Sequence, residues 1–337
     1  MDIKELLKEL TLSFSIGHID GAREILGRIV SPYAETEKIG NQGLIATIKG
    51  KSDKTLLIDA HIDEVGFIVT NVSENGFLTV SSCGGIDLRH LPAKQVVIHG
   101  KEKVKGVFIS TPPHLSKENE KYCDLGKIKI DTGLSEKAKD IISVGDFVTF
   151  DGEFFTLLNN RVASKSLDNR AGCAALALLA ERLYGKKIPV NVVLLFSDSE
   201  ELGLRGARTA AFKINADKAI VVDVSFGDAP DVKVQDSSPL SSGTMIGSSP
   251  ILSRNITRTL EEIAKEKGIQ FTNEVMGSAT GTNADVISIT KEGIECGLLS
   301  IPLRNMHTDC EIVDIRDIEA TVDLLEHFIL SGGSFND

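Results

Sequence analysis

The hydrophobic pattern opens with helical spacing. Apolar residues recur every three or four positions over Ile3–Leu12 and again over Gly21–Ile29. Two strand-like runs follow, Leu44–Lys49 and Thr55–His61, and the second contains a nearly continuous apolar stretch. Such a stretch is typical of a strand in a sheet that is covered on both faces. The start of the chain therefore predicts two helices followed by two strands.

Short alternating runs replace this pattern from about Phe67 to Leu158. Glycine, proline and asparagine turns separate the runs, and no long helical pattern intervenes. The predicted strands are Phe67–Val72, Phe77–Ser81, Gln95–His99, Val104–Ile109, Lys127–Asp131 and Asp146–Phe150. We expect an all-β module over residues 67–158, inserted between two parts of an α/β domain formed by residues 1–66 and 159–337.

Helical and strand patterns alternate after the module. The predicted helices are Asn169–Leu183, Arg205–Phe212, Ile251–Lys267, a short one near Asp285, and Ile315–Leu330. The predicted strands are Val190–Phe196, Ala219–Val224, Phe271–Val275 and Cys296–Ile301. The serine-rich stretch Asp236–Ser249 is expected to be a loop, either ordered near a site or simply on the surface. This alternation predicts an α/β fold with a mostly parallel sheet flanked by helices.

Composition and charge narrow the range of partners. The chain has 337 residues, of which 42% are hydrophobic and 25% charged, as in ordinary folded proteins. Its 37 basic and 48 acidic residues give a net charge of −11, which repels nucleic acids and anionic membrane surfaces. The longest strongly apolar run, Cys173–Ala180, is too short to span a bilayer. We therefore expect no nucleic-acid partner and no membrane partner.

The cysteines and the N-terminal sequence favour a reducing compartment. The five cysteines are widely spaced and include no C-x-x-C pair, which argues against a disulfide framework and a zinc finger: Cys83, Cys123, Cys173, Cys296 and Cys310. The sequence after Met1 continues as an amphipathic helix and lacks the basic start and apolar core of a signal peptide. A cytoplasmic location is expected.

Polar residues follow several predicted strands, and ligands of a two-sided α/β sheet bind beyond the carboxyl ends of its strands. His61 and Asp63 end the run Thr55–His61, and a spacing of two on an extended backbone puts both side chains on one face. The Asp63 carboxylate can then accept from one imidazole nitrogen while the other nitrogen binds a metal. The alternative for this pair alone is a surface histidine beside a solvated acidic turn.

Other candidates each have an ordinary structural explanation. Asp168 precedes a helix, where it could be an N-cap. Glu200 and Glu201 follow a strand, where one could bind a metal and the other act as a base, or both could interact with a helix dipole. Asp223 interrupts an apolar strand, where an unpaired buried carboxylate is costly, unless it lies just past the buried part. His307 lies in a loop, where a lone histidine is commonly solvated.

Taken together, these positions place two histidines and several carboxylates at the ends of successive strands of one sheet. Imidazole and carboxylate ligands without cysteine suit zinc, cobalt or manganese. A shared carboxylate suits two metal ions about 3.5 to 4 Å apart. The natural interpretation is a dinuclear metallohydrolase.

Five motifs occur in a fixed order along the chain. They are His61-Ile62-Asp63-Glu64-Val65-Gly66, Ser166-Leu167-Asp168-Asn169-Arg170, Glu200-Glu201-Leu202-Gly203-Leu204-Arg205-Gly206-Ala207, Val222-Asp223-Val224 and Arg304-Asn305-Met306-His307-Thr308. In these motifs, and over nearly its whole length, the sequence resembles the tetrahedral and glutamyl aminopeptidases. These are cytoplasmic dinuclear metallo-aminopeptidases of metallopeptidase family forty-two, some formerly named endoglucanases.

The resemblance implies a role for each candidate residue. Asp168 would bridge two divalent metal ions, zinc or cobalt first and manganese as an alternative. The remaining ligands would be His61 and Asp223 at one ion, and Glu201 and His307 at the other. Asp63 would orient His61. Glu200 would be the general base, taking a proton from a metal-bridged water whose hydroxide attacks the first peptide carbonyl.

The resemblance also implies a fold, substrates and an assembly. The fold would be a zinc-peptidase-like α/β catalytic domain with an inserted β-barrel-like dimerisation domain. The substrates would be short peptides with a free N-terminus. The protein would be a homo-oligomer, with dimers that assemble into a tetrahedral dodecamer. These properties follow by analogy with the family.

Three residues depart from the family pattern. The family often has aspartate where this chain has Asn283, and commonly an aromatic residue and a proline on either side of the metal-binding histidine, where this chain has Asn305 and Asp309. These loops are similar to those that shape the substrate pocket in the family. The sequence therefore does not indicate which N-terminal residue of a substrate is preferred.

Three other functions are alternatives to an aminopeptidase. A related dinuclear deacylase or carboxypeptidase would use the same ligands. A glycosidase would use Glu200 and Glu201 as its carboxylate pair, but it needs no metal. This alternative leaves His61, Asp223 and His307 unexplained. An inactive oligomeric scaffold would keep the fold without the activity.

Overall fold

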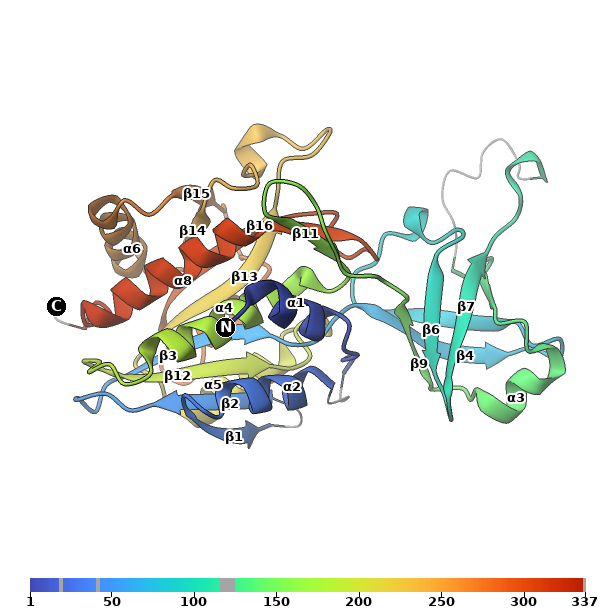
Figure 1. Cartoon of the computed structure of the whole chain (residues 1–337), viewed down its shortest axis with the longest axis horizontal. Coiled ribbons are helices and arrows are strands. Elements are labelled where there is room, and N and C mark those ends of the chain that lie inside the picture. Colours follow the sequence, from blue (N-terminus) through green and yellow to red (C-terminus); the bar gives the residue numbers. More distant parts are fainter. Residues whose placement is uncertain (18–20, 41–42, 116–124, 336–337) are drawn as a thin grey trace.

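The computed structural model describes residues 1–17, 21–40, 43–115 and 125–335. Figure 1 shows two lobes, a larger one that contains a sheet with helices on both faces and a smaller one that contains a barrel. Cys123 lies outside the described residues. Among the residues that are described, no helix is long and apolar enough to cross a membrane.

The large sheet runs in the order β1-β2-β12-β3-β13-β16-β17-β11-β10, with β14 bonded to β16 and β15 bonded to β14. The strands are β1 (Glu35–Ile39), β2 (Gly43–Ile48), β3 (Thr55–His61), β10 (Phe155–Thr156), β11 (Arg161–Ser164), β12 (Asn191–Ser197), β13 (Lys218–Phe226), β14 (Thr244–Ser248), β15 (Phe271–Val275), β16 (Glu295–Arg304) and β17 (Glu311–Asp314). Its centre, β12-β3-β13-β16, is parallel. The flanking pairs, from β1 with β2 to β10 with β11, are antiparallel.

The prediction of a mostly parallel sheet holds for this centre and is wrong for the flanks. The sequence pattern missed β1, β10, β11 and β17, which are short or carry many charged residues and therefore have little hydrophobic periodicity. The stretch Asp236–Ser249, expected to be a loop, ends in β14, whose first four residues are buried. The predicted helix Ile251–Lys267 begins three residues later than expected, at Arg254.

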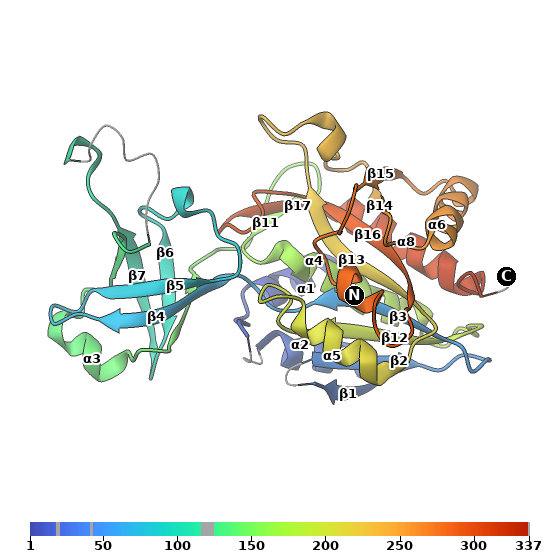
Figure 2. The same cartoon turned by 180° about the vertical axis from the view of Figure 1, so that it is seen from behind.

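Eight α-helices are present in the described residues. They are α1 (Ile3–Thr11), α2 (Gly21–Val30), α3 (Ala138–Ile141), α4 (Leu167–Leu183), α5 (Arg205–Ile214), α6 (Arg254–Lys267), α7 (Ala284–Ile287) and α8 (Ile315–Leu330). One hydrophobic core joins α1, α2, α4, α6 and α8 to one face of the sheet, and a second joins α5 and α7 to the other. Figure 2 shows α5 on the face opposite to α4 and α8. The central strands are therefore buried on both sides, as the run Thr55–His61 predicted.

The smaller lobe is a closed barrel with the order β4-β5-β8-β7-β6-β9. Its strands are β4 (Gly66–Val72), β5 (Leu78–Cys83), β6 (Gln95–His99), β7 (Lys103–Ile109), β8 (Lys129–Asp131) and β9 (Phe147–Phe150). The core contains Phe67, whose ring lies 5.0 Å from that of Phe108 and 5.7 Å from that of Phe150, both edge-on. All six strands predicted for the inserted module are confirmed.

Several side-chain contacts between described residues join the barrel to the larger lobe. The rings of Phe14, which follows α1, and His99, at the end of β6, stack with centroids 3.6 Å apart. Lys94, which precedes β6, pairs with Asp309 at 2.7 Å. The barrel thus contacts both the N-terminal segment and the loop before β17.

Candidate active site

Two strands at the centre of the sheet carry the first pair of candidate residues. His61 ends β3, and Asp223 lies on its parallel neighbour β13. The register places Asp59 opposite Val221, so His61 and Asp223, each two residues further on, lie on the same face. The His61 Nε2 atom is 3.7 Å from an Asp223 carboxylate oxygen. This is the face that α5 and α7 cover.

Asp168 lies between the two histidines. Its Oδ1 atom is 3.0 Å from His61 Nε2, and its Oδ2 atom is 3.2 Å from His307 Nε2. The same His307 atom is 3.1 Å from Glu201 Oε1. His61, Asp168 and Glu201 each offer one potential ligand atom, and these three atoms lie within 4.8 Å of one another. This set of imidazole nitrogens and carboxylate oxygens fits a divalent metal, and the two oxygens of Asp168 face different partners, as a bridging carboxylate requires.

Asp63 holds the backbone of the adjacent glutamates. Its carboxylate accepts hydrogen bonds from the backbone N–H groups of Glu200 at 2.9 Å and Glu201 at 3.2 Å. The backbone carbonyl oxygen of Asp63 lies 3.2 Å from His61 Nδ1, closer than its carboxylate at 3.5 Å. Asp63 therefore contacts both the metal-ligand candidate and the segment that carries the base candidate. Contacts of 3.7 Å or less link six of the seven residues predicted for the site, and Glu200 joins them through its backbone N–H.

Glu311 was not predicted, yet it supports two of these residues. It is buried, and its carboxylate accepts hydrogen bonds from the backbone N–H groups of Asp168 at 2.9 Å and His307 at 2.7 Å. Burial raises the pKa of Glu311 well above its ordinary value, and the nearby Asp168 acts in the same direction. The only sequence signal was a carboxylate next to the apolar pair that continues β17.

A buried ion pair next to the site was also missed. Lys165 Nζ binds the carboxylate of Glu64, which also accepts a hydrogen bond of 2.6 Å from the Ser166 hydroxyl and one of 3.2 Å from the backbone N–H of Ser15. This group ties the end of the His61-to-Gly66 motif to the start of the motif around Asp168. Glu64 stands within the first motif, but nothing in the spacing identified Lys165 as its partner.

The site has an excess of negative charge. Burial raises the pKa of Glu200 to about 9 against the opposing effect of His61. Burial acts to lower the pKa of His307, but hydrogen bonds to Asp168 and Glu201 outweigh it and raise this pKa to about 11. Burial acts to raise the pKa of Asp168, but its hydrogen bonds with the two histidines hold this pKa below the ordinary aspartate value. Divalent cations would neutralise this excess.

Each of the three residues that depart from the family pattern has a defined contact. The Asn283 amide nitrogen donates to the Asp59 carboxylate at 2.8 Å and to the Ser197 hydroxyl at 3.0 Å. Asn305 has a φ of +58°, a conformation that asparagine tolerates, and its side chain donates to a carbonyl at the end of the same loop. Asp309 pairs with Lys94 of the barrel lobe. Asn283 Oδ1, however, is buried and has no hydrogen-bond partner among the described residues.

The barrel lobe also approaches the cluster directly. A Cβ atom on Gly84, directly after β5, would lie 3.3 Å from Glu201 Oε2, and one on Gly85 would lie 3.6 Å from His307 Nδ1. Gly84 has a φ of +87°, which glycine adopts without strain. The backbone of this glycine pair is therefore one wall of the site.

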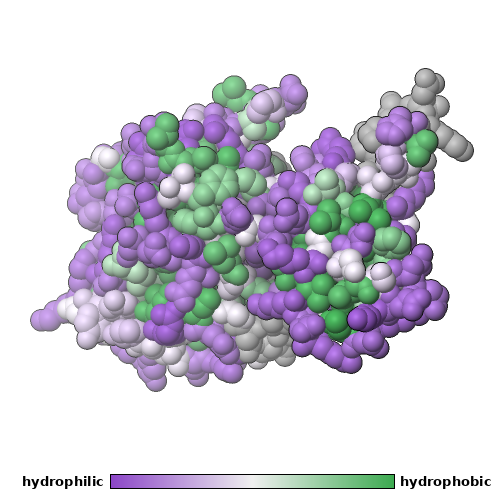
Figure 3. Space-filling model, turned by 45° about the vertical axis from the view of Figure 1, so that its right-hand side comes forward, coloured by the Kyte–Doolittle hydropathy of each residue, from purple (hydrophilic) through white to green (hydrophobic). Residues whose placement is uncertain are grey.

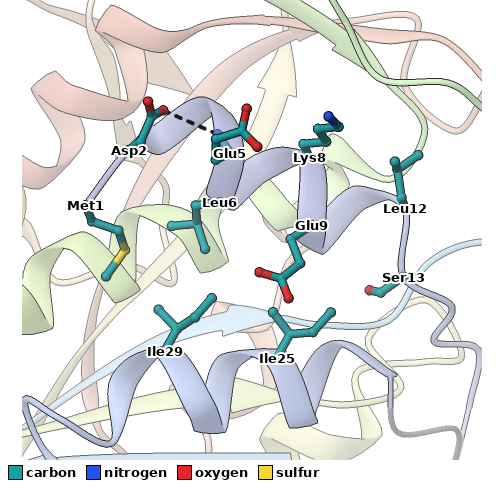
Figure 4. Close-up of a pocket in the computed structure, with 10 residues that line it drawn as sticks. All are labelled: Met1, Asp2, Glu5, Leu6, Lys8, Glu9, Leu12, Ser13, Ile25 and Ile29. Carbon is teal, nitrogen blue, oxygen red and sulfur yellow. Dashed lines mark hydrogen bonds between the residues drawn. The ribbon is translucent and has the colours of Figure 1, made fainter.

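A separate groove lies between α1 and α2, with a volume of about 710 Å³ (Figure 4). Apolar side chains of Leu6, Leu12, Ile25 and Ile29 line it together with charged side chains of α1. No residue of the cluster lies in it. The groove therefore lies apart from the chemically distinctive part of the molecule.

An α/β sheet that gathers imidazoles and carboxylates at the carboxyl ends of its parallel strands is typical of metal-dependent hydrolases. Residues 42–324 match the model of the M42 glutamyl aminopeptidase family, and the chain belongs to this family. It is 31% identical over 330 residues to the lysyl aminopeptidase of Pyrococcus furiosus, a match that covers 95% of this chain and 94% of the relative.

Solved structures agree with this assignment. An aminopeptidase from the archaeon Desulfurococcus kamchatkensis aligns with a TM-score of 0.92 and 30% identity over 98% of this chain and 95% of its own. The TET1 peptidase of Pyrococcus horikoshii, which can assemble into a tetrahedron or a large octahedral shell, aligns with a TM-score of 0.86 and 29% identity over 98% and 99%. The chain is therefore an aminopeptidase, a hydrolase of the exopeptidase type, as the motifs predicted, and its family implies divalent metals.

Proposed function

We propose that this protein removes N-terminal residues from short peptides with a free N-terminus, using two divalent metal ions. The observation that carries the proposal is the position of Asp168, whose two carboxylate oxygens lie 3.0 and 3.2 Å from two different histidines. Asp168 would contact both ions. His61 and Asp223 would complete one site, and Glu201 and His307 the other. Zinc and cobalt suit these ligands best, and manganese is the alternative.

The chain's own residues would position the peptide bond and move protons. Metal ions bound here would supply Lewis acidity toward a water molecule and the peptide carbonyl. Glu200 would act as general base and return the proton to the leaving amine. Asp63 would fix the backbone from which Glu200 projects, because it accepts the Glu200 N–H at 2.9 Å. The excess of carboxylates would favour a substrate α-ammonium group at the same place.

We further propose that residues 67–158 mediate dimerisation and that dimers build a larger homo-oligomer. Figure 3 shows apolar side chains gathered on the exposed face of the barrel lobe. Exposed apolar residues of this lobe include Val107, Ile109 and Val144. The self-assembly of the Pyrococcus horikoshii relative supports a closed shell such as a dodecamer. The catalytic domain would then comprise residues 1–66 and 159–337.

A cytoplasmic location completes the proposal. The four cysteines that the structure describes are free, which suits a reducing compartment.

The test is hydrolysis of a panel of aminoacyl chromogenic substrates by metal-reconstituted protein, with EDTA and N-acetylated substrates as controls. Cleavage that EDTA abolishes and that requires a free amine supports the proposal. Bound metal without any cleavage would favour the deacylase or carboxypeptidase alternative. Protein that binds no metal and cleaves nothing would favour the scaffold.

A further inference from the structure

One carboxylate near the site has no part in the proposed mechanism. Glu274 lies on β15 and is partly buried. The Ser300 hydroxyl donates to its Oε2 atom at 2.7 Å, and the Ser225 hydroxyl donates to its Oε1 atom. Among the residues that the structure describes, Glu274 has no cationic partner. Two neutral donors thus fix the position of a carboxylate without neutralising its charge.

The sheet places Glu274 on the same face as the candidate metal ligands. Asp223 and Ser225 are two residues apart on β13, so their side chains share a face. The parallel register sets Ser300 of β16 directly beside Asp223. Because both serine hydroxyls contact Glu274, its carboxylate lies on this face, further along the sheet from His61. Burial raises the pKa of Glu274, and the Ser225 and Ser300 hydrogen bonds oppose this, while the charge of Asp223 adds to it.

Three cationic side chains around the site are engaged by other groups. The Arg304 guanidinium binds the side chain and the backbone carbonyl of Asp228. Lys94 pairs with Asp309 at 2.7 Å, and Lys165 pairs with Glu64. A substrate side chain would therefore meet an unneutralised carboxylate on this side of the site, while these three cations are each engaged. Such a side chain is bound more strongly if it carries a positive charge.

We propose that Glu274 is a specificity-determining residue that binds the positively charged side chain of an N-terminal lysine or arginine. This inference rests on the proposed aminopeptidase function, in which the substrate α-amino group lies near the metal ligands. The first side chain would extend from there along the sheet face, past Ser225 and Ser300. A long flexible side chain with a terminal cation can reach a carboxylate at the far end of such a path.

The experiment compares lysyl and norleucyl p-nitroanilides, which differ at the end of the side chain by an ammonium group. Metal-reconstituted wild-type protein is expected to show a kcat/KM about tenfold or more higher for the lysyl substrate, the range of a charge-assisted hydrogen bond. Glu274→Gln is expected to remove most of this preference by lowering lysyl kcat/KM, with norleucyl kcat/KM within about twofold of wild type. Glu274→Asp, which keeps the charge, is expected to retain part of the preference.

The controls separate this inference from the proposed function. Glu292→Gln removes an equal charge at an exposed position and is expected to leave both rates unchanged. Metal content, measured by elemental analysis, is expected to match wild type in Glu274→Gln. Equal cleavage of both substrates by wild type, or an equal loss of both rates in Glu274→Gln, would overturn the role of Glu274 and leave the aminopeptidase proposal intact. Cleavage of no aminoacyl substrate at all would overturn both.

Discussion

The carboxylate of Asp63 accepts the backbone N–H of Glu200 at 2.9 Å, although the two residues are 137 positions apart in the chain. It accepts the N–H of Glu201 as well, at 3.2 Å. The loop after β3 thus fixes the loop after β12. Neighbouring side chains on such a backbone point apart, so Glu201 can face His307 while Glu200 remains available for a different task.

Replacing Glu200 tests that division of roles. Glu200→Gln keeps the shape of the side chain but cannot accept a proton as a base, so turnover is expected to fall by a factor of about 10² to 10⁴. Metal content is expected to stay near wild type, since the five ligand candidates are unchanged. Steady-state rates and elemental analysis of the same preparation provide the measurement. Loss of both metal and activity would mean that Glu200 is a ligand and Glu201 the base.

Replacing Asp168 tests the bridging assignment. Asp168→Asn leaves one carbonyl oxygen in place of a carboxylate whose oxygens face His61 and His307, so both metal sites are expected to lose occupancy. Elemental analysis after dialysis, with folding checked by circular dichroism, provides the measurement. Two metal ions retained at full occupancy would rule out a shared carboxylate.

Replacing Glu311 tests whether its carboxylate holds the backbone of Asp168 and His307 in place. Glu311→Gln replaces one acceptor oxygen by an amide that faces a backbone N–H, so one of the two hydrogen bonds is lost. The variant is expected to lose about 1 to 3 kcal/mol of stability and a large part of its activity. Glu319→Gln on the exposed surface of α8 is the control. A Glu311→Gln protein as stable and as active as that control would show that the two backbone positions need no anchor.

Most of the architecture could be predicted because it depends on side chains that the sequence displays. The helices and central strands follow from apolar spacing, and the ligand candidates from imidazoles and carboxylates in ordered motifs. Glu311 could not be found in this way, because its partners are backbone N–H groups, which nearly every residue has. The short strands β10, β11 and β17 could not be predicted either. Two to four residues contain too little alternation of hydrophobic and polar positions to indicate a strand.

Replacing Gly84 tests whether the backbone of Gly84 and Gly85, which forms one wall of the site, constrains Glu201. A Cβ atom there would lie 2.8 Å from Val65 Cγ1 as well as 3.3 Å from Glu201. Gly133 has a similarly positive φ of +71° but open space around it. Both Gly→Ala variants are expected to lose about 1 kcal/mol from backbone strain, but only Gly84→Ala is expected to lose activity as well. Equal activities in the two variants would mean that the wall does not constrain Glu201.

The titration of His99 predicts how the stability contributed by the contact between the two lobes depends on pH. Burial lowers the pKa of His99 from 6.5 to about 4, and Lys103 and Lys165 act in the same direction, while Glu64 opposes them. The folded state therefore keeps this imidazole neutral at pH values where the unfolded chain protonates it. Its contribution to stability is complete above about pH 6.5 and is lost progressively as the pH falls to about 4.

The measurement is the urea midpoint of wild type and His99→Phe between pH 7 and pH 4. Phenylalanine can still stack on Phe14 but cannot titrate, and it gives up the hydrogen bond between His99 and Thr149. The variant is expected to be less stable at pH 7 and to lose less stability on acidification than wild type. Parallel pH profiles would show that protonation of His99 does not weaken the folded state.

The order of the cluster along the chain has a consequence for biosynthesis. His61 precedes the barrel, Asp168, Glu201 and Asp223 follow it, and His307 and Glu311 come only after β16. A polypeptide still being translated therefore lacks one histidine of the cluster and the anchor beneath it until nearly all of the sheet has been made. With the proposed roles of these residues, we expect peptidase activity to begin only when the C-terminal part has joined the fold.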